Sequence, residues 1–450
     1  VANSLSGSIS DLSGNSADLT LTASDLPNLN NLRINAFDGV VVDGYITGGT
    51  VFADADRDQT LDAGEASDTT DNSGNFTILG GEGPLVLSGG TDISTNLAFE
   101  GVFEAPPRAE VINPLTTLLV EMAGYSASDA SFQSTQAPLR TALGLDASID
   151  LYTYDPIIEA SRPNATAGEI TIAVTAQKEA AKIANLLVQG SSVLAGAVTS
   201  GTLNSGDAGR AIASALASYI NARPSQAIDL SDTTVIQTVL NSAAGNLSGI
   251  DTARVSSVAS LAASVIGASN DKVAAASADA AGLTAIAQSQ VVAQGDAADA
   301  LESGTNSNDL SSAQSSYTGA NLDSAVNSAS VGTIFPVYLE ISESVASQFE
   351  GDSAGGTGTN GYGFTVTRSG DTNTAFSVDY TISGEVNSSD FASGSLTGTL
   401  SFVSGETSKS LTLDVLADLD RESDESFSVT LSNASVLANL TTEQASGEIL

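Results

Sequence analysis

The chain has 450 residues, which is long enough for two to four domains with cores of their own. Asp and Glu number 53 against 14 Lys and Arg, so the formal net charge is -39, and a surface of this sign repels nucleic acid and anionic membranes. His and Cys are both absent, which excludes disulfides, thiolate or imidazole metal sites and catalysis by histidine.

An enzyme would have to use carboxylates, Tyr, Ser or Lys, and paired carboxylates could in principle hydrolyse a glycoside. The chain has no Trp, and aromatic residues make up only 5% of it, so few ring faces exist to stack against sugars. We therefore expect a protein that is not an enzyme. Because no run of about 18 apolar residues occurs, we also expect no membrane insertion.

The first third of the chain is expected to be β-rich. Residues 1–35 suggest strand pieces or an extended linker. Residues 36–110 contain short β-type runs separated by Gly, Asp and Asn turns, such as Val-Val-Val at 40–42 and Leu-Val-Leu at 85–87. This pattern predicts an immunoglobulin-like β-sandwich.

The pattern changes at Asn113 and Pro114, which suit the cap and first turn of a helix that Gly124 would end. Apolar residues then recur at helical spacing, as at Ile212, Leu216 and Ile220. Residues 111–302 are therefore predicted to form an Ala-rich α-helical domain. It carries no motif with readable chemistry.

The last third is predicted to return to β-structure. Residues 303–333 are rich in Ser, Asn and Gly, which is typical of a linker. Residues 334–450 alternate apolar and polar positions over several runs, for example Phe-Ser-Val-Thr-Leu at 427–431. They predict a second antiparallel β-sandwich. Because the chain ends at Leu450 inside an apparent strand, we expect an excerpt of a longer protein.

The most specific motif is the 54–65 loop, twelve residues with the ligand spacing of an EF-hand-type calcium loop. Its oxygen ligands fall at loop positions one, three, five, seven, nine and twelve, with the seventh acting through its backbone carbonyl; they are Asp54, Asp56, Asp58, Thr60, Asp62 and Glu65. Calcium takes about six to eight hard oxygen ligands, which this set is suited to supply. We therefore expect a bound Ca²⁺.

Two positions in the 54–65 loop lead to separate expectations. Gln59 stands where the pattern prefers Gly, so it must adopt a positive φ at a cost on the order of 1 kcal/mol. Leu61 at position eight is expected to face the core. The flanking segments read as strands rather than as the two helices of an EF-hand, so the loop should join neighbouring strands. Such a loop suits a permanent calcium staple more than a switch.

The segment 44–79 resembles the calcium-binding B-type repeats of bacterial surface adhesins. The likeness rests on Gly-Thr-Val-Phe at 49–52, Leu-Asp-Ala-Gly-Glu at 61–65 and Thr-Thr-Asp-x-x-Gly-Asn-Phe at 69–76. This resemblance implies a collagen-adhesin B-like sandwich that binds calcium.

Residues 334–450 resemble a Calx-beta module, through Phe-Glu-Gly at 349–351, Ser-Asp-Phe at 389–391, the Gly-rich run at 398–406 and the acidic run at 418–427. In calcium-binding members of that family, carboxylates meet at one end of the sandwich. The resemblance places Glu350, Asp390, Asp418, Glu422 and Glu425 there as a second calcium site. A solvated acidic edge is the alternative.

Together these features predict a secreted, cell-surface protein in which calcium stiffens the sandwiches. The leading hypothesis is a structural component of a bacterial surface or extracellular assembly, such as an S-layer, filament or giant adhesin, that self-associates into a homopolymer or lattice. One alternative is a calcium-dependent adhesion module that binds a glycan or protein ligand. The other is a secreted, carboxylate-based hydrolase.

Overall fold

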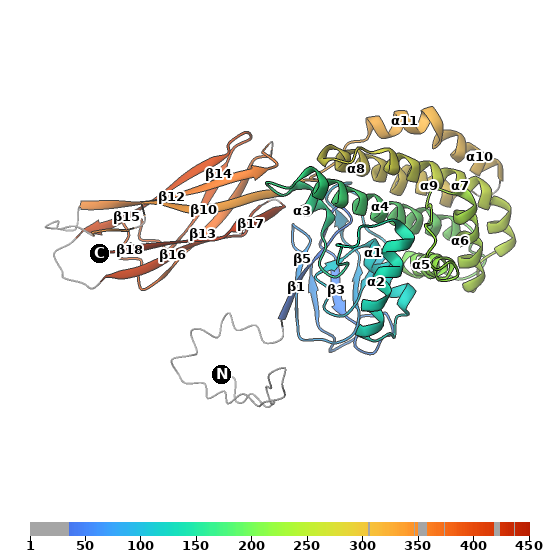
Figure 1. Ribbon diagram of the computed structural model, residues 1–450, viewed down its shortest axis with the longest axis horizontal. Helices are drawn as coiled ribbons and strands as arrows, with labels where there is room; N and C mark the ends of the chain where they lie inside the picture. The colour runs from blue at the N-terminus through green and yellow to red at the C-terminus, as the bar shows by residue number, and fades with distance from the viewer. Residues whose placement is uncertain are drawn as a thin grey trace.

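The computed structural model describes residues 36–304, 307–345, 347–349, 358–372, 374–417, 424–435 and 437–450. It has mixed helical and β-sheet content, with two groups of sheets separated along the chain by a block of helices. Figure 1 shows the first group of strands packed beneath the helices and the last group extending away to one side. The predicted strand pieces in residues 1–35 lie outside the described residues.

The first group of strands forms two main sheets and a short ribbon. One sheet has the order β5-β1-β9, the other β4-β3-β6-β8, and β2 pairs with β7. Their bounds are β1 Ala36–Val41, β2 Ile46–Thr47, β3 Thr50–Ala53, β4 Ser67–Thr69, β5 Asn75–Leu79, β6 Leu85–Ser88, β7 Thr91–Asp92, β8 Val102–Ala105 and β9 Val111–Ile112. Apolar residues of both main sheets, among them Phe76, Leu87 and Phe103, meet in one core.

Helices follow from Pro114 onward. Asn113 caps the first helix and forms a capping box with Thr116, and Gly124 ends the helix at φ 91°, so its predicted bounds are confirmed. The helices are α1 Pro114–Ala123, α2 Asp129–Leu143, α3 Pro156–Ser161, α4 Ala167–Ala195, α5 Ser205–Asn221, α6 Thr233–Asn246, α7 Thr252–Ala275, α8 Ala280–Gln294, α9 Asp296–Ser303, α10 Ser307–Ser316 and α11 Gly319–Ser328.

The first sandwich and the helices share one continuous apolar core. Buried residues of the sheets, such as Ile78 and Leu87, belong to the same cluster as Leu186 on α4, Leu216 on α5 and Ile266 on α7. No break in packing therefore coincides with the boundary drawn at 110/111.

The segment 303–333 differs from the predicted linker because it contains α10 and α11. Leu310, Leu322 and Val326 are buried against the other helices, so a few apolar side chains suffice to fix a Ser-rich segment as helix. After α11, the backbone N–H groups of Gly332 and Thr333 donate to Ser94 and Ile93 of the first sandwich. This stretch is therefore bound to the rest of the molecule.

The C-terminal strands form two facing sheets, β15-β12-β10-β17 and β11-β18-β16-β13-β14. Side chains alternate between buried and exposed along β15 and β16, as the sequence pattern predicts. The sheets enclose a core of their own. The strands are β10 Val337–Val345, β11 Ser347–Gln348, β12 Gly358–Gly370, β13 Phe376–Gly384, β14 Thr397–Phe402, β15 Ser408–Ala417, β16 Glu425–Ser432, β17 Ala438–Thr442 and β18 Gln444–Ile449.

Candidate metal centre

The 54–65 loop connects β3 to β4, which pair antiparallel, so strands flank it as expected. It brings carboxylate oxygens of Asp54, Asp56 and Asp58 within 4.8 Å of one another. These are positions one, three and five of the predicted ligand set. Alternate residues on a tightly turning loop thus point to one side, which is the arrangement that a hard cation requires.

Asp54 is the buried end of this group, with 0% exposure. Its Oδ1 accepts hydrogen bonds from the backbone N–H groups of Arg57 and Asp58, at 2.7 and 3.2 Å. Its Oδ2 accepts from the Gln59 N–H at 2.7 Å and from the Tyr125 hydroxyl at 2.5 Å. Asp54 therefore shapes the turn around its own carboxylate.

Glu65 closes the loop from the other end. Its Oε1 accepts from the N–H of Ala55 at 2.7 Å and its Oε2 from the N–H of Asp62 at 3.1 Å. Thr60 is held by its N–H, which donates to Asp58 at 2.8 Å. Asp62, Thr60 and Glu65 thus line the same turn, although they do not belong to the 4.8 Å group that the three aspartates form.

The two expectations about unusual positions have different outcomes. Gln59 adopts φ 68° and Arg57 φ 66°, so the predicted left-handed residue is confirmed at position six. The expectation that Leu61 faces the core is wrong, because its side chain is 43% exposed. The loop is instead anchored by polar contacts with the helices.

Three side chains bind the 54–65 loop to the helical block. Tyr125, in the connection between α1 and α2, donates to Asp54. The Arg57 guanidinium donates to the carbonyls of Tyr125 and Ala127 at 3.0 and 3.2 Å. Arg210 on α5 donates to the Gln59 carbonyl at 3.2 Å. The loop is therefore held between a sandwich and two helical segments.

Arg210 also pairs with Glu104 of β8, with Nε and Oε1 3.0 Å apart, and the Glu104 side chain is fully buried. Burial, together with the nearby Glu121, raises the pKa of Glu104 to about 7, although Arg210 acts to lower it. The other carboxylate oxygen of Glu104 has no hydrogen-bond partner among the described residues. This ion pair joins β8 to α5, next to the bond from Arg210 to the 54–65 loop.

The chemistry of the donor set fits a calcium ion. Partial desolvation and the neighbouring Asp58 raise the pKa of Asp56, and Asp62 and Glu65 add to this effect. Among the described ion pairs, none joins a Lys or Arg to the three aspartates, since Arg57 faces backbone carbonyls. A cation at this turn would offset the repulsion among carboxylates that lack a basic partner.

The predicted C-terminal site is described only in part. Glu350, Asp418 and Glu422 lie outside the described residues. Asp390 lies beside the end of β15, because its carbonyl accepts from the Leu416 N–H at 2.8 Å, and its Oδ2 accepts from the Asn387 N–H at 2.6 Å. Glu425 begins β16 and pairs with Ile449 of β18.

The same end of the sandwich holds both described ligands. Asp390 is followed by Phe391, whose ring meets that of Phe427 with centroids 5.9 Å apart, and Phe427 follows Glu425 by two residues. Among the described residues, the 54–65 loop holds the one cluster of three or more acidic side chains whose spacing suits a metal ion. The second calcium site stays a prediction.

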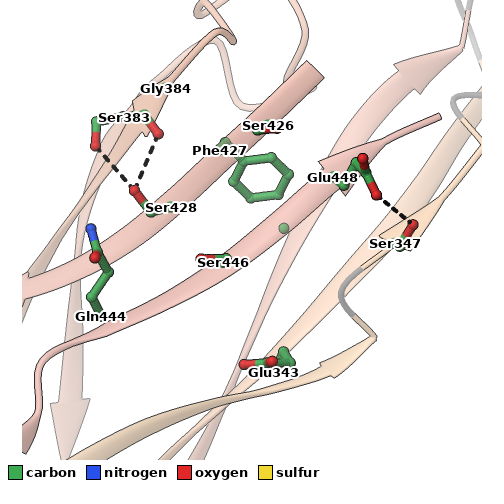
Figure 2. A pocket seen from close by; sticks show the side chains of 11 residues that line it. Glu343, Ser347, Ser383, Gly384, Ser426, Phe427, Ser428, Gln444, Ser446 and Glu448 are labelled. Atoms are coloured by element: carbon green, nitrogen blue, oxygen red, sulfur yellow. Dashed lines mark hydrogen bonds between the residues drawn. The ribbon is translucent and has the colours of Figure 1, made fainter. Parts of the chain in front are cut away.

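A hollow of about 560 Å³ lies on the C-terminal sandwich (Figure 2). Its lining is rich in serine, and Ser428 and Ser383 lie within hydrogen-bond distance of each other at 3.4 Å. Phe427 is the one aromatic residue among the lining residues, and it is only 2% exposed. Because no ring face is presented, this hollow lacks the stacking platform of a carbohydrate site.

No protein-family model matches this chain, and no curated protein matches it. Among solved structures it is similar to the apo-form Calx CBD1 domain, at 26% identity over 25% of this chain and 96% of that chain, with a TM-score of 0.21. It is also similar to the calcium binding domain CBD12 of CALX1.1, at 26% identity over 25% of this chain and 44% of that chain, with a TM-score of 0.20. The Calx CBD2 domain matches at 14% identity over 25% of this chain and 85% of that one, with a TM-score of 0.19.

Among the described helices, none is both long enough and apolar enough to cross a bilayer.

Proposed function

We propose that this chain is a calcium-stabilised structural component of a bacterial cell surface or extracellular assembly. The observation that carries the proposal is the group of three aspartate carboxylates within 4.8 Å in a loop of EF-hand spacing. The residues proposed to hold the ion are Asp54, Asp56, Asp58, Thr60, Asp62 and Glu65.

Calcium in the 54–65 loop would stabilise more than the loop. The same turn is bonded to Tyr125 and Ala127 between α1 and α2, and to Arg210 on α5. An ion that fixes the turn also fixes the acceptors and donors of these three contacts. The proposed role of calcium is therefore to stabilise the junction between the first sandwich and the helices.

The proposed setting for this role is extracellular. Extracellular calcium modules bind at about 10⁻⁴ to 10⁻³ M, which suits a site that stays filled outside the cell. The net charge of -39 and the absence of Cys are compatible with a calcium-rich exterior. Self-association into a homopolymer or lattice is the proposed outcome, with the C-terminal sandwich available as a contact surface because its core is separate.

The test is to compare assembly and melting in calcium and in chelator. Analytical ultracentrifugation and electron microscopy should show larger species in about 2 mM Ca²⁺ than in EGTA, and the melting temperature should fall in EGTA. An unchanged melting curve together with no bound metal by mass spectrometry of the native protein would contradict the proposal. The adhesion and hydrolase alternatives stay predictions.

A further inference from the structure

A partly enclosed cleft, separate from the 54–65 loop, lies between the first sandwich and the helices. Its volume is about 360 Å³. The loop before β8 forms one wall, α4 and the start of α5 form another, and the junction of α8 and α9 forms a third. Cavities of roughly 300 to 1,000 Å³ are the size that holds small organic ligands.

The cleft is acidic, and one oxygen of its buried carboxylate lacks a partner in the described part of the chain, whereas the other, Oδ1 of Asp92, accepts from the N–H and hydroxyl of Ser94 and from the Thr95 N–H. Asp92, which lines the cleft, is 3% exposed, and its Oδ2 has no hydrogen-bond partner among the described residues. Glu100, Asp299 and Glu302 line the more exposed part. No Lys or Arg is among the residues that line the cleft.

A second buried carboxylate, that of Asp43, interacts electrostatically with Asp92. Its two oxygens accept only from amide groups, those of Gln290 at 2.7 Å and Gln294 at 3.4 Å, and Gln294 also lines the cleft. Burial and the charge of Asp92 raise the pKa of Asp43 to about 7. Among the described ion pairs, none reaches either aspartate.

Two buried carboxylates that interact without a cation are costly, because desolvation favours their neutral forms. A positive group in the cleft would remove that cost. We propose that this cleft binds a small organic cation, a primary ammonium or guanidinium group on an apolar body, with its charge against Asp92.

The shape and lining favour an organic cation over a metal ion. Apolar side chains of Phe99, Val102 and Leu187 line the cleft together with serines of α4, so part of the wall suits hydrocarbon. A divalent ion needs about six oxygens within roughly 2.6 Å of one point and fills only a small part of such a volume. An ammonium group needs one desolvated carboxylate and tolerates an apolar environment around its carbon atoms.

Phenethylammonium is a suitable probe, because it carries one ammonium group and one ring. Isothermal titration calorimetry in EGTA should show saturable binding. 2-Phenylethanol, the neutral analogue, should bind at least about tenfold more weakly, and 3-phenylpropionate should not bind, because a buried charge pair accounts for much of the affinity. Equal affinity for the ammonium and the alcohol would overturn the proposal, as would displacement of the probe by sub-millimolar Ca²⁺ or Mg²⁺.

Three variants locate the site. Asp92→Asn should weaken binding of phenethylammonium at least about tenfold. Glu302→Gln, at the exposed part, should weaken it severalfold, and Val188→Phe should block entry without touching a carboxylate. The last two keep the test decisive if Asp92→Asn fails to fold. Unchanged affinity in both of them would overturn the proposal.

A matched control is Asp271→Asn on α7, which removes one exposed carboxylate away from the cleft lining and should leave binding intact. Asp56→Asn in the 54–65 loop should also leave it intact, because the cleft and the loop use different residues. Loss of binding in either variant would contradict a site at Asp92.

Discussion

The two sandwiches differ in how each relates to its surroundings. The first shares a continuous core with α1, α4, α5 and α7, and its acidic loop bonds to helical segments. The C-terminal sandwich has its own core and meets the helices through a few contacts, such as the Tyr338 hydroxyl, which donates to the Ile158 carbonyl at 3.1 Å. Similar secondary structure therefore does not imply similar independence.

The two acidic sites differ in whether their carboxylates come from one segment of the chain or from several. The 54–65 loop supplies its carboxylates from one continuous segment, so their spacing is set locally. At the C-terminal end Asp390 and Glu425 come from separate segments, Asp390 beside β15 of one sheet and Glu425 on β16 of the other, so their spacing depends on how the two sheets pack. Calcium should accordingly act first on the first sandwich and the helices that share its core, here called the fused region. The following predictions test that contrast.

The largest effect should come from matched core truncations. Phe103→Ala should lower the free energy of unfolding by about 3 to 5 kcal/mol. The loss should affect the first sandwich and the helices together, since Phe103 lies in their shared core. Phe427→Ala, at an equally buried site, should lower only the C-terminal transition. Hydrogen exchange at increasing denaturant measures both. Separate unfolding of the first sandwich and the helices in Phe103→Ala would contradict the shared core.

A pH effect of a few kcal/mol should be confined to the fused region. The pKa of Asp43 is about 7 when folded against 3.8 for an ordinary Asp, so the folded state binds more protons between these values. Its stabilising contribution is full below pH about 3.8 and is lost as pH rises through 7.

Asp43→Asn should remove this contribution and leave that of Glu104, whose pKa is also raised to about 7. At pH 8 the variant should be more stable than the wild type by roughly 2 to 4 kcal/mol, and the difference should shrink towards pH 5. Thermal unfolding at several pH values checks this. The C-terminal transition serves as the internal control, and equal pH profiles for both proteins would contradict the assignment.

Calcium itself should have a smaller effect. With a dissociation constant of about 10⁻⁴ to 10⁻³ M, about 2 mM free Ca²⁺ stabilises the folded state by roughly 0.6 to 1.8 kcal/mol. Asp56→Ala should remove most of this gain, because it takes away the side-chain oxygens proposed to bind the ion at an exposed position. Asp271→Ala should keep it. Calorimetry with and without EGTA distinguishes these results.

The smallest effect should come from the C-terminal sandwich. Asp390→Asn keeps an amide oxygen that can accept from the Asn387 N–H but removes the negative charge of one predicted ligand, so the C-terminal melting temperature should change little and its response to calcium should weaken. The response of the first sandwich should not change. A C-terminal transition that ignores calcium in the wild type would show that this acidic end is solvated.

Features set by neighbouring residues were the most predictable from the sequence. The cap at Asn113, the stop at Gly124, the positive φ of Gln59 and the convergence of Asp54, Asp56 and Asp58 all follow from spacing over a few positions. The calcium-ligand pattern was visible for the same reason.

Features that depend on distant partners were not predictable. The contacts of the 54–65 loop with Tyr125 and Arg210, the exposure of Leu61 and the burial of Asp43 all depend on residues far away in the sequence. The helices α10 and α11 looked like linker because their order comes from packing rather than composition. The cleft at Asp92 carried no sequence signal, since its walls come from four separate segments.

The most direct test of the central claim is hydrogen exchange by mass spectrometry in calcium and in EGTA. Calcium should slow exchange in residues 54–65 and also in residues 124–128 and around Arg210, because the loop bonds to both helical segments. Asp56→Ala, which removes the side-chain oxygens at loop position three, should abolish both changes and Asp271→Ala neither. Protection confined to the loop, or no calcium effect at all, would contradict calcium stabilisation of the junction between the first sandwich and the helices.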